Sequence, residues 1–278
     1  MIPNPTNMKI TVLRLKHLLV FALIVALTGC SKNDTNIPLT IFSVSDDIAL
    51  GLQFDQEILK DPQNYPLLDS VQYASVYAHL YAIRNTILAS GKVKYKDQFQ
   101  WKCRIIRDDA VINAFCVPGG NIYIYTGLIK FLDNEAEFAG VLGHEMAHAD
   151  LRHTSQQLTL VYGETFLLNL ILGNNSSQLA QVLSELALGL GNLAYSRQHE
   201  YQSDEYSVKY LYPTKYDAGG ISDFFVKMQS QPSPPAFLST HPSPSDRLTK
   251  ITEVFNSLGG VHGQKFITEY QQFKSLLP

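Results

Sequence analysis

The stretch GHEMAHAD, residues 143–150, places two histidines four positions apart, with a glutamate directly after the first. On an α-helix, residues i and i+4 lie one above the other on the same face. The imidazoles of His144 and His148 can therefore converge on one metal ion, with the carboxylate of Glu145 close to the same point. The same pattern also arises by chance in ordinary helices, where its histidines form a solvated polar face. The flanking residues help to decide between these interpretations.

The residues around this motif predict a helix with one buried side. Asp133-Asn134 can cap its N-terminus, and Glu135 and Glu137 follow in the first turn, where the helix dipole favours negative charge. Apolar residues then recur at spacings of three and four, at Phe138, Leu142, Met146 and Ala149. With a 3.6-residue repeat, the two histidines project about 120° from this stripe. We therefore expect them to face a cleft beside the core.

Two histidines and a glutamate at this spacing are typical of zinc metallopeptidases. A catalytic zinc site needs a third protein ligand and keeps its fourth position open for water. The candidates for the third ligand are His153, His199, Glu200 and the residues around His241. A metzincin would carry a histidine six positions after the second ligand. Thr154 occupies that position, so the metzincin class is excluded.

A second helical stretch, SRQHEYQSDEYSVKYL at residues 196–211, carries two carboxylates on one face. Glu200 and Asp204 are spaced i, i+4 and therefore lie close together on a helix. Glu200 is suited to bind the metal, and Asp204 is suited to accept a hydrogen bond from a ligand imidazole and so fix its tautomer. Taken alone, the pair is equally consistent with an acidic, solvated helix face.

Four motifs occur in order along the chain, namely NAFCVPGGNIYIYTGL (113–128), HEMAH (144–148), SRQHEYQSD (196–204) and THPSPSDR (240–247). Together they resemble the HtpX-like and CAAX-prenyl-protease-like family of gluzincin metallopeptidases, in particular its soluble, lipid-anchored periplasmic members. The resemblance extends from about Ser45 to the C-terminus. No repeat is detectable after residue 250, so the helical-repeat domain of some relatives is not expected.

The resemblance implies one Zn²⁺ ion per chain, with the ligands His144, His148 and Glu200. It also implies that Glu145 is the general base and that Asp204 orients a ligand imidazole. The chain departs from the family at Ser203, where the family usually has alanine. This small change on the helix leaves the implied ligands in place.

The expected fold is α+β and mainly helical, a zincin-type metallopeptidase domain at 45–278 with a small antiparallel sheet beside the HExxH helix. Helices are predicted at 45–60 and 68–90, and strands at 100–107, 112–117 and 121–125. The first two strands flank a short polar loop and predict a hairpin. In a symmetric hairpin Cys103 lies opposite Cys116, which would allow a disulfide. The alternative is two small buried thiols.

The N-terminus predicts export and lipid attachment. A basic region precedes the apolar run at 18–27, which is shorter than the roughly 20 residues that a membrane-spanning helix needs and suits a signal-peptide core. The run ends in LTGC, residues 27–30, which resembles the bacterial lipobox. We therefore expect a lipoprotein signal peptide at 1–29, lipid on Cys30 and a polar tether at 30–44. The alternative is an ordinary signal peptide or a buried helix.

The expected mechanism follows from the implied ligands. Zinc would polarise the scissile carbonyl and lower the pKa of water, and Glu145 would take the proton. The tetrahedral oxygen needs a further donor, and His241 in the Thr-His-Pro loop is the candidate. His241 could alternatively occupy the open zinc position and hold the enzyme latent, or be a loop histidine bonded to backbone. Arg247, in the same motif, could tie that loop down through a carboxylate.

The expected function is a metalloendopeptidase of the bacterial periplasm or cell envelope that degrades unfolded, misfolded or misassembled envelope proteins. A lipid on Cys30 would anchor it to a membrane, with the outer membrane favoured over the inner. The alternative is a chaperone-like assembly module with latent or minor peptidase activity. A net charge of −3 without a basic patch argues against nucleic acid as a partner. The sequence carries no signal for the oligomeric state.

Overall fold

The computed structural model describes residues 42–172, 189, 192–231, 235–242 and 246–278. The predicted signal peptide at 1–29, Cys30 and most of the tether therefore lie outside the described residues. Residues Pro38–Pro278 belong to one compact unit. Among the described helices, none has both the length and the apolar character needed to cross a membrane.

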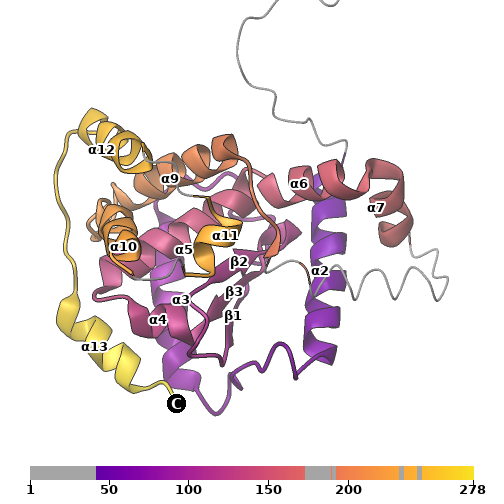
Figure 1. Cartoon of the computed structure of the whole chain (residues 1–278), viewed down its shortest axis with the longest axis horizontal. Coiled ribbons are helices and arrows are strands. Elements are labelled where there is room, and N and C mark those ends of the chain that lie inside the picture. The colour runs from indigo at the N-terminus through magenta and orange to yellow at the C-terminus, as the bar shows by residue number, and fades with distance from the viewer. Residues whose placement is uncertain (1–41, 173–188, 190–191, 232–234, 243–245) are drawn as a thin grey trace, which may run out of the picture. The chain divides into compact units, whose positions relative to one another are not determined.

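The described chain is mainly helical with one small sheet, as the sequence predicted (Figure 1). Helices α2 (Val44–Lys60) and α3 (Ala74–Ala89) precede the sheet. The helices that follow it are α4 (Thr126–Phe131), α5 (Glu135–Asp150), α6 (His153–Tyr162), α7 (Glu164–Ile171), α9 (Arg197–Leu211), α10 (Gly220–Gln229), α11 (Phe237–Thr240), α12 (Arg247–Ser257) and α13 (Ile267–Ser275).

The sheet is mixed rather than antiparallel throughout. Its strands are β1 (Cys103–Ile106), β2 (Ala114–Cys116) and β3 (Ile122–Tyr125), in the order β1-β3-β2. β3 pairs in parallel with β1 and antiparallel with β2, so the predicted hairpin between β1 and β2 does not form. The loop between β1 and β2 bonds to other elements instead. The backbone carbonyl of Asp108 accepts a hydrogen bond from the backbone of Gly127, and that of Ile112 accepts one from the backbone of Phe237.

The disulfide that a hairpin would have allowed between Cys103 and Cys116 does not form, for the same reason, and the alternative of two buried thiols is confirmed. Both residues are in register with Ile122, one on each side of β3. Two strand spacings separate their Cα atoms by about 10 Å, beyond the range that a disulfide bridges. Both thiols are free and buried, and burial raises the pKa of each to about 12.

Helix α2 is fixed at its N-terminus and against the sheet. Ser43 and Asp46 form a capping box that satisfies the first backbone donors. Further along, the carboxylate of Asp55 accepts hydrogen bonds from Arg104 on β1 and from the hydroxyl of Tyr123 on β3. These bonds join α2 to two strands of the sheet.

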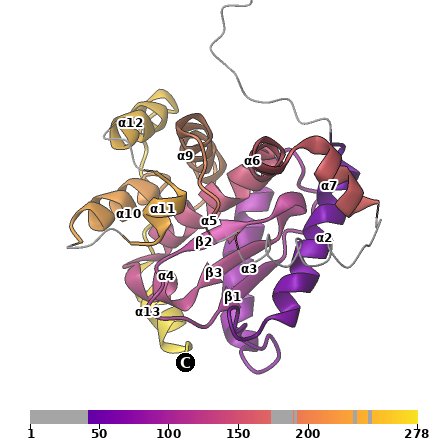
Figure 2. The same ribbon diagram turned by 45° about the vertical axis from the view of Figure 1, so that its right-hand side comes forward.

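Helix α5, which carries the HExxH motif, is buried along its whole length, and none of its sixteen residues is exposed to solvent. It packs against α9, α10, α3 and β2 (Figure 2). Two glycines allow this close packing, because a Cβ at Gly140 would lie 2.7 Å from the backbone nitrogen of Ile221 and one at Gly143 would lie 3.0 Å from Ser207 Oγ. The histidines therefore face the protein interior, more enclosed than the predicted apolar stripe implied.

Candidate metal centre

The two histidines of the motif are held by a well-capped helix. Asn134 is the N-cap of α5 and its side chain accepts a hydrogen bond from the backbone of Glu137, as the sequence predicted. About three to four turns further on, His144, Glu145 and His148 all have side chains that are fully buried.

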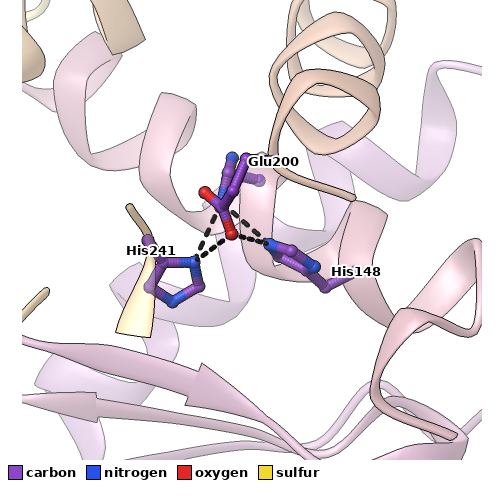
Figure 3. A group of neighbouring side chains, drawn as sticks. His148, Glu200 and His241 are labelled. Carbon is purple, nitrogen blue, oxygen red and sulfur yellow. Dashed lines mark hydrogen bonds and ion pairs between the residues drawn. The ribbon is translucent and has the colours of Figure 1, made fainter. Parts of the chain in front are cut away.

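Four side chains from three parts of the chain converge at this point. His144 and His148 come from α5, Glu200 from the first turn of α9, and His241 from the residue that ends α11. One nitrogen or oxygen of each lies within 4.8 Å of the others, so the group could hold one metal ion. Figure 3 shows the rings of His148 and His241 turned toward the Glu200 carboxylate. The sequence predicted His144 and His148 as ligands and included Glu200 and His241 among the candidates for the third, of which Glu200 was preferred.

The distances between these atoms match a tetrahedral zinc site. His144 Nε2 lies 3.0 Å from His148 Nε2 and 3.3 Å from His241 Nδ1. Oxygens of Glu200 lie 3.5 Å from His144 Nε2, 3.4 Å from His148 Nε2 and 3.1 Å from His241 Nδ1. Ligands about 2.1 Å from a central zinc ion are about 3.4 Å from one another at the corners of a tetrahedron. The four residues therefore fit zinc in both chemistry and spacing.

Unsatisfied polar atoms surround the same point. Neither oxygen of Glu145 has a hydrogen-bond partner among the described residues, and neither has Nε2 of His241. These two groups face each other, with His241 Nε2 3.4 Å from Glu145 Oε1. Buried polar atoms are normally paired, so a carboxylate left in this state fits a group that handles water or substrate beside the metal.

Charges around the centre explain its protonation in the metal-free protein. Burial opposes a charge on His144, but hydrogen bonds and attraction from Asp204 and Glu200 raise its pKa to about 9. Burial acts against ionisation of Glu200 as well, and His241, His144 and His148 hold its pKa well below the usual range. These charges therefore favour the protonated form of His144 when no metal is bound, and a metal cation would displace that proton.

Glu145 shows the opposite behaviour from Glu200. Burial raises its pKa, and the negative charge of Glu200 adds to this, while His241 and His144 oppose it. A carboxylate with a raised pKa is a stronger base than one in water, which suits proton transfer near neutral pH. The two glutamates are therefore tuned in opposite directions, one toward a permanent charge and one toward accepting a proton.

A buried ion cluster supports the centre from behind. His144 Nδ1 lies 2.9 Å from Asp204 Oδ1, and because a carboxylate can only accept, that nitrogen carries the hydrogen. Arg247 donates to both oxygens of Asp204, at 2.7 and 2.6 Å, and its Nη1 lies 2.8 Å from Glu200 Oε2. Arg247 also donates to the carbonyls of His241 and Pro242, so it ties the loop as well as the carboxylates.

His241 is turned inward rather than bonded only to backbone. Its ring is fully buried and stacks on Phe237, with ring centroids 4.2 Å apart. Its backbone nitrogen donates to the carbonyl of Phe237, which ends α11 in a short turn. This turn directs the side chain to the fourth corner of the ligand cluster.

Tyr195 is a neighbour of the site that sequence reasoning missed. Its ring stacks on His148 with centroids 3.9 Å apart, and its hydroxyl is 2.9 Å from Thr154 Oγ1. Its backbone nitrogen donates to the carbonyl of Thr240. The one feature of the sequence that could have pointed to Tyr195 is its position directly before the motif at 196–204.

His153 and His199, the other candidates for the third ligand, lie outside the cluster. They stack on each other with centroids 4.4 Å apart, and His153 contacts the far nitrogen of His148. Burial, together with repulsion from His199, lowers the pKa of His153 to about 3.

Residues 78–254 match the model of peptidase family M48. The chain is 28% identical over 158 residues to a putative beta-barrel assembly-enhancing protease of Vibrio cholerae, covering 52% of this chain and 33% of that protein. It is 28% identical over 176 residues to the mitochondrial metalloendopeptidase OMA1 of Schizosaccharomyces pombe, covering 62% and 50%. It is 30% identical over 161 residues to the beta-barrel assembly-enhancing protease of Escherichia coli, covering 53% and 33%. The matched part thus spans a third to a half of these relatives.

Proposed function

Because this chain belongs to peptidase family M48, we propose that it is a zinc-dependent metalloendopeptidase. We further propose that it is anchored by lipid in the bacterial cell envelope and degrades misfolded or misassembled envelope proteins there. The observation that carries the proposal is Glu145, a fully buried carboxylate without a hydrogen-bond partner among the described residues, beside a cluster of metal-binding atoms.

The names of the relatives support the peptidase activity and a link to the assembly of envelope proteins. The Schizosaccharomyces pombe protein is called a metalloendopeptidase, and the Escherichia coli protein is called a protease that enhances beta-barrel assembly. By analogy with these names, we assign peptide-bond hydrolysis and an envelope location to the chain described here. The lipid anchor rests on LTGC at 27–30 alone.

We assign the metal to His144, His148 and Glu200, with Asp204 orienting the first of these imidazoles. Zinc, when bound, supplies Lewis acidity that polarises a carbonyl and lowers the pKa of water. Glu145 accepts the proton of the attacking water, as its raised pKa allows, and then returns that proton to the nitrogen of the departing amine. The reaction thus consumes one water and leaves Glu145 in its starting state.

His241 gives the site a resting form. Its Nδ1 lies 3.3 Å from His144 Nε2 and 3.1 Å from Glu200 Oε1, so it would take the position that a catalytic zinc site keeps for water. A peptide carbonyl would need the same position, so the His241 side chain would have to leave it before cleavage. We therefore favour the latent-site role of His241 over that of a transition-state donor.

Two substitutions test the assignment. Glu200→Gln should greatly reduce bound zinc, because an amide is a poor replacement for an anionic ligand. Glu145→Gln should keep zinc bound and abolish cleavage. The measurements are metal content of the purified mature chain and hydrolysis of unfolded casein, with and without chelator. Glu205→Gln is the matched control, since Glu205 lies on the same helix, half exposed and paired with Lys209, and it should change neither quantity. A Glu145→Gln protein that cleaves casein at the parent rate would disprove the assigned base.

The closed fourth corner also favours one alternative, a chaperone-like assembly module whose peptidase activity is latent or minor. This function predicts that the parent protein suppresses aggregation of an unfolded protein while leaving casein intact. It also predicts that Glu145→Gln does not impair the suppression. Casein cleavage that zinc restores after chelation would instead favour the peptidase.

A further inference from the structure

The two histidines of the HExxH motif have different partners on the side away from the metal. His144 Nδ1 meets the carboxylate of Asp204, the kind of group that commonly supports a zinc ligand. His148 Nδ1 instead meets another imidazole, with His153 Nδ1 3.1 Å away. Next in line, His153 Nε2 lies 3.0 Å from Oε1 of Gln202 on α9. A row of three side chains therefore leads from the metal centre to the surface of α9.

Proton placement along this row follows from the metal centre. His148 directs Nε2 into the ligand cluster, 3.4 Å from Glu200 Oε1, so in the metal-bound form that nitrogen must be bare. The hydrogen of the neutral ring is then on Nδ1, and it can only be donated to a bare Nδ1 of His153. His153 in turn carries its hydrogen on Nε2 and donates it to the Gln202 carbonyl. Each donor meets an acceptor, and only one arrangement of hydrogens achieves this.

We propose that His153 is a positioning residue that fixes the tautomer and the ring orientation of the zinc ligand His148, with Gln202 holding His153 in place. This inference rests on the proposed zinc site. It assigns a role to a residue that the catalytic scheme leaves unused.

The local backbone places His153 for this task. Arg152 adopts a left-handed conformation with φ 63°, which ends α5 and starts α6 at the next residue. This break returns the His153 ring to the end of α5 that carries His148. The guanidinium of Arg152 is bonded to Asp47 and to the carbonyls of Phe42 and Ser43, which secures the turn.

The surroundings hold the ring but offer no second strong partner. His153 is 1% exposed and stacks on His199. Ser203 Oγ lies 3.2 Å from its Nδ1, so the serine hydroxyl is a neutral second donor that shares the Nδ1 lone pair with His148. His144 thus donates its Nδ1 hydrogen to a carboxylate, that of Asp204, whereas His148 donates its own to the neutral imidazole of His153.

The test compares zinc affinities of the mature chain, measured by competition with a chelator. His153→Leu removes the acceptor and should weaken zinc binding about 10- to 100-fold, the usual effect of losing such a partner. His153→Asn places an amide oxygen near the position of Nδ1 and should retain most of the affinity. Gln202→Leu removes only the second link and should cause a smaller loss. His262→Asn, at an imidazole whose side chain is 70% exposed, is the control and should bind zinc as the parent does.

Two results would overturn the inference. One is unchanged zinc affinity in His153→Leu. The other is an equal loss in His153→Asn and His153→Leu, which would indicate packing rather than hydrogen bonding. If His153→Leu does not fold, the test rests on Gln202→Leu. An unchanged zinc affinity in that variant would refute the proposed role of His153 and Gln202. Two-bond ¹H–¹⁵N correlations of the zinc-loaded parent give an independent readout, because they must place the hydrogen of His153 on Nε2 and leave its Nδ1 bare. Failure of the parent to bind zinc would instead contradict the proposed function itself.

Discussion

Replacing Arg247 by methionine should destabilise the metal-free protein by about 3–5 kcal/mol, the cost of breaking a buried ion pair by removing one partner. The Arg247 side chain is 1% exposed and bonds both oxygens of Asp204 while it pairs with Glu200. Methionine keeps an apolar side chain over the Phe225 ring, which Arg247 covers at 4.1 Å. It leaves the two buried carboxylates without the guanidinium, so that only the His144 imidazole balances both of them. The substitution therefore removes mainly the positive charge and its hydrogen bonds, and keeps most of the apolar packing.

The effect can be measured by thermal unfolding followed by circular dichroism. In a domain of this size each kcal/mol shifts Tm by roughly 2–4 °C, so Tm should fall by about 6–20 °C in chelator. The loss should be smaller with zinc, because the metal would balance Glu200. Lys250→Met is the matched control on the same helix, since Lys250 pairs with Asp246 at 3.7 Å and both side chains are about half exposed. Such a pair contributes less than about 1 kcal/mol. Equal Tm values for the two variants would refute the reasoning.

Three further changes have defined outcomes. His241→Ala should raise casein cleavage by the mature chain, because it empties the fourth corner of the ligand cluster; a fall of about 10² in kcat would instead identify a transition-state donor, and an unchanged rate would remove both roles. Cys30→Ser should abolish labelling with palmitate, and labelling equal to the parent would contradict the lipobox. Burial raises the pKa of Asp55, but hydrogen bonds from Arg104 and Tyr123 outweigh it and hold this pKa below its ordinary value. The stabilisation is thus present above the unfolded pKa of about 3.9 and lost as pH falls through the lower folded value. Asp55→Asn should therefore cost about 1.5–3 kcal/mol at pH 7 in urea unfolding and much less near pH 2; an equal cost at both pH values would exclude this linkage.

The sequence alone was sufficient for the features that depend on neighbours along the chain. The i, i+4 spacing of His144 and His148, and that of Glu200 and Asp204, places each pair on one face of a helix whatever surrounds it. The N-cap of α5 at Asn134 is equally local, because its side chain bonds the backbone three residues away. These three features define most of the candidate site before any tertiary structure is considered.

Only the tertiary structure decided how distant segments meet. Strand periodicity indicates which faces are buried but not which strand pairs with which. The sequence therefore predicted a hairpin of β1 and β2, which would have allowed a bond between Cys103 and Cys116, whereas β3 in fact lies between these two strands. In the same way, no local pattern places Tyr195 on the ring of His148 or His241 at the fourth corner. The physical reason is that these contacts join residues tens of positions apart, and their geometry is set by how α5, α9 and the sheet pack together rather than by the conformational preferences of any one segment.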